Sequence, residues 1–94
     1  MRLRIVILMI KDSIVCNQAI KKFYDFLSTK GLENLDIELV DVEENSSILD
    51  QYKIDGIPAF LMFEDEKLIQ CFIGGDEKTI KELISKMRGK IKKE

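Results

Sequence analysis

Pro58 is the only proline of the chain, and it stands directly before the apolar run of residues 60–63. Proline has no backbone N–H to donate to a strand ladder, so within a sheet it is confined to a strand's first residue, to an edge or to a bulge. An apolar residue, then proline, then a strand is also a pattern that favours a cis peptide bond. We therefore predict a buried strand over 59–63, entered through a cis Ile57–Pro58 bond.

Two segments nearer the N-terminus also have the pattern of strands. Residues 3–10 are continuously apolar apart from Arg4, as expected of a strand that is covered on both faces. Residues 35–42 alternate between apolar and polar and then change phase at Val40. This change of phase predicts a bulge or a frayed end in the second strand.

The first of three expected helices follows strand 3–10. Its apolar residues recur at three- and four-residue spacing, which indicates one buried face; they are Cys16, Ala19, Ile20, Phe23, Phe26 and Leu27. Asp12 or Ser13 is suited to cap the N-terminus of this helix, and Gly31 is suited to end it.

The other two expected helices also have capping residues at their ends. A short helix should begin at Ser46 or Ser47 and end at Asp55-Gly56. The last helix should begin after Asp76, which can cap it, and Gly89 should end it.

These segments define the fold class. Strands 59–63 and 68–73 are joined by four charged residues, so they should form an antiparallel hairpin. Strands 3–10 and 35–42 are joined by a helical crossover and should be parallel. The order β-α-β-α-β-β-α predicts a single α/β domain over 1–94. Its four-stranded mixed sheet should have 35–42 and 68–73 at the edges and helices on both faces.

Composition limits the function. The chain has a net charge of −2, with 46% hydrophobic and 34% charged residues, two cysteines and no histidine. Nucleic-acid binding normally needs a basic surface, a membrane span needs about 20 apolar residues, and a structural zinc site needs four Cys or His ligands. We expect none of these. The sequence shows no export signal, so we expect a cytoplasmic location with reduced cysteines.

The chain resembles the thioredoxin/glutaredoxin superfamily in three respects. These are the order of its elements, Ser13-Ile14-Val15-Cys16 after the first strand, and Ile57-Pro58 before the third strand. The resemblance covers essentially the whole chain. Gly74-Gly75-Asp76 before the last helix resembles a glycine-rich segment of glutaredoxins. The resemblance implies a thioredoxin-like fold and thiol–disulfide redox chemistry.

The active-site loop departs from the family pattern, which is Cys-x-x-Cys at the start of the first helix. Either Ser13 stands for the first cysteine and Cys16 is the second, or Cys16 is the first and Ala19 replaces the second, as in a monothiol glutaredoxin. The first placement is favoured, because Cys16 shares the apolar face of the helix, whereas an attacking thiol should be exposed at the helix tip. Cys16 also suits a small core residue and Ser13 an N-cap. Cys71, in an apolar strand, is expected to be structural.

Two functions remain open. In the first, Cys16 is the catalytic thiol and Ser13 occupies the degenerate first-cysteine position; the protein is at most a monothiol thiol–disulfide oxidoreductase. Its partners would be protein or peptide thiols and disulfides, or glutathione, with no other cofactor. The expected substrate-binding residues are Lys11, Ile57, Pro58, Gly74, Gly75 and Asp76, with a ligand carboxylate at the N-terminus of the last helix. In the second, the chain is a redox-inactive binding module that keeps the groove beside Pro58.

Overall fold

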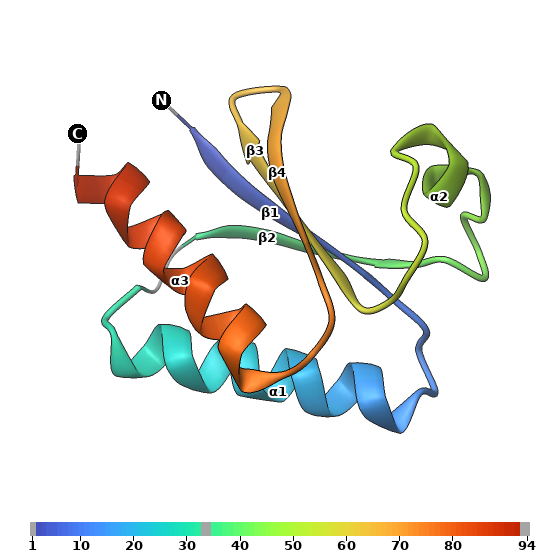
Figure 1. Ribbon diagram of the computed structural model, residues 1–94, viewed down its shortest axis with the longest axis horizontal. Helices are drawn as coiled ribbons and strands as arrows, with labels where there is room; N and C mark the ends of the chain where they lie inside the picture. Colours follow the sequence, from blue (N-terminus) through green and yellow to red (C-terminus); the bar gives the residue numbers. More distant parts are fainter. Residues whose placement is uncertain (1, 33–34, 93–94) are drawn as a thin grey trace.

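The computed structural model describes residues 2–32 and 35–92 (Figure 1). The chain alternates strands and helices in the predicted order until the hairpin of the last two strands. The elements are β1 (Leu3–Met9), α1 (Ile14–Thr29), β2 (Asp36–Asp41), α2 (Ser47–Gln51), β3 (Ala59–Glu64), β4 (Lys67–Ile73) and α3 (Glu77–Lys92).

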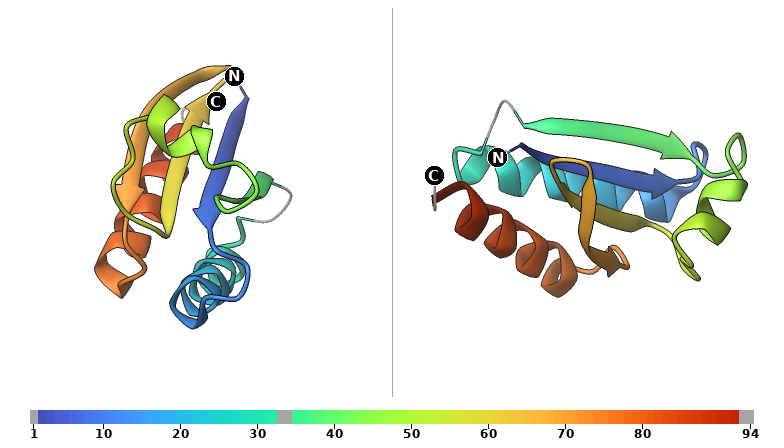
Figure 2. Two further views of the ribbon diagram at one scale, coloured as in Figure 1. Left: turned by 90° about the vertical axis from the view of Figure 1, so that its right-hand side faces the viewer. Right: turned by 90° about the horizontal axis from the view of Figure 1, so that it is seen from above.

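The four strands form one mixed sheet in the order β2-β1-β3-β4. Strand β1 is parallel to β2 and antiparallel to β3, and β3 is antiparallel to β4. Helices α1 and α3 cover one face of the sheet and α2 lies on the other (Figures 1 and 2). The predicted fold class, strand order and two-sided cover are confirmed.

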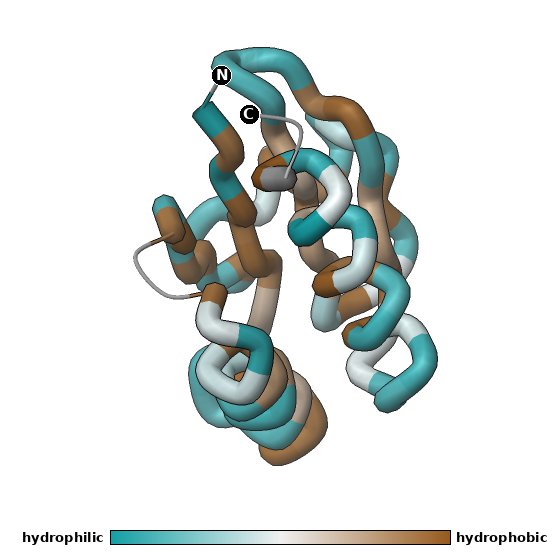
Figure 3. Tube along the Cα trace, turned by 90° about the vertical axis from the view of Figure 1, so that its left-hand side faces the viewer, coloured by the Kyte–Doolittle hydropathy of each residue, from teal (hydrophilic) through white to brown (hydrophobic). Residues whose placement is uncertain are grey.

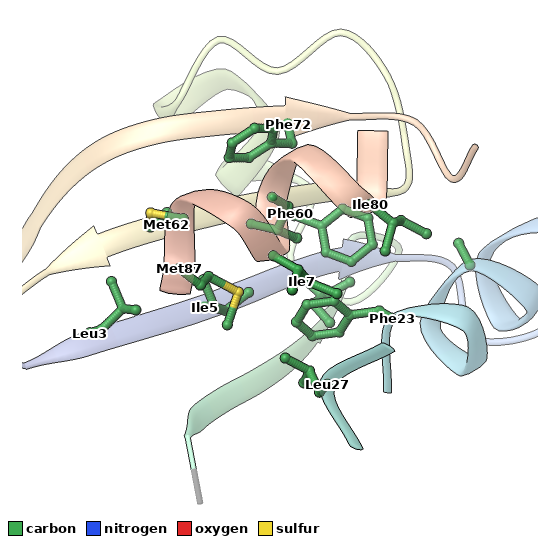
Figure 4. Close-up of a cluster of buried hydrophobic side chains, with 13 residues drawn as sticks. Leu3, Ile5, Ile7, Phe23, Leu27, Phe60, Met62, Phe72, Ile80 and Met87 are labelled. Carbon is green, nitrogen blue, oxygen red and sulfur yellow. The ribbon is translucent and has the colours of Figure 1, made fainter. Parts of the chain in front are cut away.

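The larger core lies between the sheet and the pair α1 and α3. Phe23 from α1 and Phe60 from β3 are both fully buried, and their ring centroids are 5.3 Å apart. Ile7 from β1 and Ile80 from α3 lie beside these two rings (Figure 4). Figure 3 shows α3 alternating between hydrophilic and hydrophobic residues, and α1 buries one face that carries Cys16, Ala19, Phe23 and Leu27. Burial of one face of each helix therefore fixes both helices on the sheet.

A second, smaller core on the other face explains the change of phase in β2. Leu35 and Ile37 pack on the α1 and α3 side, whereas Val40 and Val42 pack on the α2 side. The ladder between β1 and β2 runs without a break from Asp36 to Asp41, so the predicted bulge or frayed end at Val40 is wrong. The apolar residues shift from odd-numbered to even-numbered positions because the start of β2 is covered on the α1 and α3 face and its end on the α2 face.

The ladder between β3 and β4 does contain an irregularity, which lies between Met62 and Phe63. The turn of this hairpin is shorter than the four residues expected, because the strands extend to Glu64 and from Lys67.

Two helix ends differ from the predictions. Helix α2 ends at Gln51, before Asp55-Gly56, and Lys53 then takes a positive φ of 55°. Helix α3 does not end at Gly89 but continues through it to Lys92. The end of α1 is as predicted, since Gly31 follows it with a φ of 68° and donates its N–H to the carbonyl of Ser28.

Candidate functional site

Three loops meet at one end of the sheet, and strand pairing explains why. Leu8 near the end of β1 pairs with Ala59 at the start of β3, and Ala59 pairs with Ile73 at the end of β4. The segments just beyond these positions are residues 10–13, 56–58 and 74–76. Every residue named from the sequence as a candidate site residue lies in these loops or in the first turn of α1.

The Ile57–Pro58 peptide bond is cis, the isomer expected from the sequence, and Pro58 is fully buried. The carbonyl oxygen of Pro58 accepts a hydrogen bond of 2.8 Å from the backbone N–H of Gly74. Gly74 has a φ of 116°, a conformation that side-chain-bearing residues rarely adopt. The two loops on either side of the hairpin are thus held together by their backbones.

Gly75 brings α1 against this pair of loops. A Cβ atom built on Gly75 would lie 2.6 Å from the Ala19 Cβ and 3.4 Å from the Pro58 Cγ. Only a glycine permits so close an approach between the loop and the helix. Cys16 lies one turn before Ala19 on the same buried face of α1. Cys16 therefore lies on the same face of α1 as the residue that contacts Gly75.

Ser13 is the N-cap of α1. Its Oγ atom accepts a hydrogen bond of 3.2 Å from the backbone N–H of Cys16, and its carbonyl oxygen accepts one from Asn17. The Cys16 side chain is only 1% exposed. The Ser13 side chain thus stabilises the helix start, and the thiol of Cys16, one turn later, is covered.

The loop that carries Lys11 is fastened by two side chains that the sequence analysis did not single out. The backbone N–H of Lys11 donates to Asp41 Oδ2 at 3.3 Å, and its carbonyl oxygen accepts from Asn17 Nδ2 at 3.1 Å. The Lys11 side chain is exposed. Asp41 is the last residue of β2, and it lies near the end of the predicted strand 35–42. Because parallel strands β1 and β2 end on the same side of the sheet, this position is the signal that could have indicated Asp41.

Asp76 caps the N-terminus of α3, as the sequence predicted. Its carboxylate accepts hydrogen bonds from the N–H and the hydroxyl of Thr79, at 3.2 and 2.7 Å. These hydrogen bonds lower the pKa of Asp76, and the one from the Thr79 hydroxyl has the largest effect. The positive charge of Lys22 on α1 adds a smaller effect in the same direction. The Asp76 carboxylate thus satisfies one backbone N–H of the first turn of α3. The binding of a ligand carboxylate at this helix N-terminus stays a prediction.

Exposed apolar side chains flank the site. Ile14 and Val15, between Ser13 and Cys16, are 73% and 63% exposed, and Ile73 at the end of β4 is 44% exposed. The sequence alone indicates no role for these residues, because a lone apolar residue at a helix start or strand end has no periodic signal. Their exposure gives the site an apolar rim.

Cys71 lies apart from Cys16. It is half-buried and packs in the smaller core on the α2 face, whereas Cys16 belongs to α1 on the other face of the sheet. Burial raises the pKa of the Cys71 thiol, and the nearby charge of Asp55 raises it further. Both cysteines are free thiols, and the sheet between them prevents a disulfide within the chain.

Within residues 2–32 and 35–92, no cluster of His, Cys, Asp or Glu side chains is placed to bind a metal ion. None of the described helices combines the length and the apolar content needed to cross a membrane.

The comparisons with known proteins agree with this geometry. The sequence matches the family model described as Thioredoxin over residues 15–88. Among solved structures, thioredoxin from Trypanosoma brucei brucei is similar, with a TM-score of 0.78 and 19% identity over 97% of this chain and 76% of that one. Thioredoxin 1 from Thermosipho africanus has a TM-score of 0.74 and 22% identity over 95% and 94% of the two chains. Thioredoxin from Fasciola hepatica has a TM-score of 0.74 and 24% identity over 90% and 80%. No curated protein matches.

Proposed function

This chain belongs to the thioredoxin family, as a thioredoxin-like redox protein, and from that premise we propose that it is a one-thiol member acting through Cys16. Its substrates are disulfides of protein or peptide partners, or mixed disulfides with glutathione. The observation that supports this proposal is the pair Ser13 and Cys16 at the start of α1. Ser13 caps the helix, and in our proposal it stands at the first-cysteine position; Cys16 follows one turn later on the face of α1 that also carries Ala19.

The chemistry follows from having one thiol. The Cys16 thiol loses its proton to solvent, and the thiolate attacks one sulfur of the substrate disulfide. A mixed disulfide with Cys16 forms, and the other sulfur leaves as a thiolate. Ser13 has no sulfur with which to release the bound partner, so an external thiol such as glutathione must attack the mixed disulfide. Cys16 leaves as a thiolate that regains a proton from solvent, and the partner's sulfur is left in a mixed disulfide with the external thiol. A second external thiol then displaces the partner's thiol, so that two external thiols are joined in a disulfide for each substrate disulfide reduced.

The residues around Cys16 would orient the partner. Backbone groups at Ile57, before the cis-proline, offer pairing to an extended peptide, while Ile14, Val15 and Ile73 provide apolar contacts. The exposed Lys11 would meet a carboxylate of the partner, and the N-terminus of α3 beside Gly74, Gly75 and Asp76 would offer a second place for one. The first turn of α1 must open for substrate to reach Cys16, because that side chain is 1% exposed. Turnover should therefore be slow.

The same burial supports a second candidate function. A thiol that is 1% exposed, with no thiol at position 13, also suits a module that binds peptides without exchanging disulfides. In that case the cis-proline loop and the apolar rim would be retained for binding alone.

One experiment separates these functions. A peptide–glutathione mixed disulfide is incubated with excess glutathione, and release of the peptide thiol is followed for the parent, Cys16→Ser and Cys71→Ser proteins. We expect slow turnover that Cys16→Ser abolishes and Cys71→Ser leaves unchanged. Equal rates for the parent and Cys16→Ser would refute the redox proposal. Binding of the reduced peptide, seen as NMR shifts around Pro58, would then support the binding module.

A gain-of-function variant tests the placement of the site. Ser13→Cys should restore a thiol at the helix tip, form a disulfide with Cys16 under mild oxidation and speed turnover at least tenfold. The lost N-cap should cost about 1 kcal/mol, so the variant should fold. A folded variant whose two thiols form no intramolecular disulfide would show that Ser13 does not occupy the first-cysteine position.

A further inference from the structure

A groove lies between α1 and α3 at the end of α1 that is far from the cis-proline site. Phe26 and Lys30 line it from α1, and Ile84, Arg88 and Gly89 line it from α3. Figure 1 shows the two helices diverging toward their C-terminal ends. The fourteen residues from Cys16 to Lys30, at 1.5 Å per helical residue, place the groove about 21 Å along α1 from the thiol. The groove is therefore a separate feature of the molecule.

The groove has an apolar floor and a basic rim. Ile84 is 3% exposed and Phe26 is partly buried, and both belong to or pack against the larger core. Lys30, Lys81 and Arg88 surround this floor, and Lys81 Nζ lies 5.7 Å from the centroid of the Phe26 ring. Of the described residues that line the groove, none is acidic. Lys81 Nζ also forms an ion pair of 3.1 Å with Glu77 Oε1, so Lys30 and Arg88 are the two cations on which an anion site in this groove rests.

The groove also accounts for the glycine inside α3. Glycine is among the least favourable residues for a helix interior, yet α3 continues through Gly89. A Cβ atom at this position would have no atom within 4 Å, so core packing does not require a glycine there. The missing side chain instead keeps the α3 wall of the groove open.

We propose that this groove binds a small organic anion with an aromatic body, such as an arylcarboxylate or an aryl phosphate. The volume of about 570 Å³ lies in the range of small-molecule sites. The aromatic body stacks on Phe26 and covers Ile84. The anionic group lies between Lys30 and Arg88, whose guanidinium suits the two oxygens of a carboxylate or phosphate.

The test uses naphthalene-2-carboxylate and 2-naphthyl phosphate as probes, with naphthalene-2-methanol as the neutral analogue, in amide NMR titrations of the whole chain. A ligand of about 13 heavy atoms should bind with a dissociation constant on the order of 1 mM. We expect shifts confined to the C-terminal parts of α1 and α3, at least fivefold weaker binding of the neutral analogue, and weaker binding at high salt.

Two variants and a control decide the outcome. Arg88→Gln removes a rim cation, and Gly89→Leu fills the groove while favouring the helix; each should weaken binding of both anions at least fivefold. Lys86→Gln removes a cation of α3 that does not line the groove, and it should leave binding within twofold. The proposal is overturned if Lys86→Gln weakens binding as much as Arg88→Gln, if the neutral analogue binds equally well, or if the shifts lie elsewhere. Binding of only one anion would restrict the ligand to that class.

Discussion

Replacing Gly75 with alanine tests the contact that joins α1 to the cis-proline loop. The added Cβ would lie 2.6 Å from the Ala19 Cβ, whereas carbon atoms in contact are normally about 3.5–4.0 Å apart. One of the two segments must therefore move by about 1 Å. Overpacking of this kind costs roughly 1–3 kcal/mol. Alanine in place of glycine also restricts the conformations of the unfolded chain, and this stabilises the folded protein by about 0.4–1 kcal/mol. We expect Gly75→Ala to lower the free energy of unfolding by about 1–2 kcal/mol.

A double-mutant cycle with Ala19→Gly isolates the contact. Alone, Ala19→Gly should cost about 1 kcal/mol for glycine in a helix and about 0.8 kcal/mol for the lost buried methyl group. In the double variant the new methyl group of residue 75 occupies the space left at residue 19. The combined loss should therefore fall short of the sum of the two single losses by about 1–2 kcal/mol.

The measurement is urea unfolding followed by circular dichroism, with Gly89→Ala as the matched control. The same substitution at Gly89 meets no atom within 4 Å and should raise the free energy of unfolding by roughly 1 kcal/mol, the helix preference of alanine. The reasoning is refuted if Gly75→Ala is neutral or stabilising, or if the losses of Gly75→Ala and Ala19→Gly simply add.

Three further predictions concern individual side chains. In a Cys71→Ser background, Cys16 should react with a thiol reagent far more slowly in the native state than in urea, because it is 1% exposed; equal rates would contradict its burial. The pKa of Asp76 is lowered in the folded state, so its contribution to stability is complete above the ordinary aspartate pKa and is lost as the pH falls through the lowered one. Asp76→Asn should therefore destabilise the protein at neutral pH and narrow its stability difference from the parent at acid pH, as urea unfolding at several pH values would show. Phe23→Ala should lower the free energy of unfolding by about 3–5 kcal/mol, whereas alanine at the exposed Tyr24 should change it much less.

Local sequence patterns were sufficient to predict the strand order, the helical crossover and the buried face of α1. Apolar periodicity reports which side of an element is covered, and Cys16 fell on the buried side of α1 as its spacing with Ala19 and Phe23 indicated. Pro58 could be placed at the start of a strand because its missing N–H allows few other positions. Ser13 was one of two candidate caps, and its hydrogen bond to Cys16 shows that it is the N-cap.

Other features depend on contacts between residues far apart in the chain. Val40 disturbs the alternation of β2 because α2 covers that end of the strand on the opposite face, and not because the strand bulges. Gly89 lies inside a helix because the residues around it continue to pack on the sheet, which outweighs the low helix preference of one glycine.

In the candidate site, too, some features follow from the sequence and others depend on contacts between distant segments. The sequence by itself determined which residue types stand in the three loops, and strand pairing then brought those loops to one end of the sheet. Only the tertiary structure decided that Asp41 holds the Lys11 loop and that Gly75 touches Ala19. The physical reason is that hydrogen bonds and close packing between distant segments depend on where the whole sheet places them, and no local pattern in the sequence records that placement.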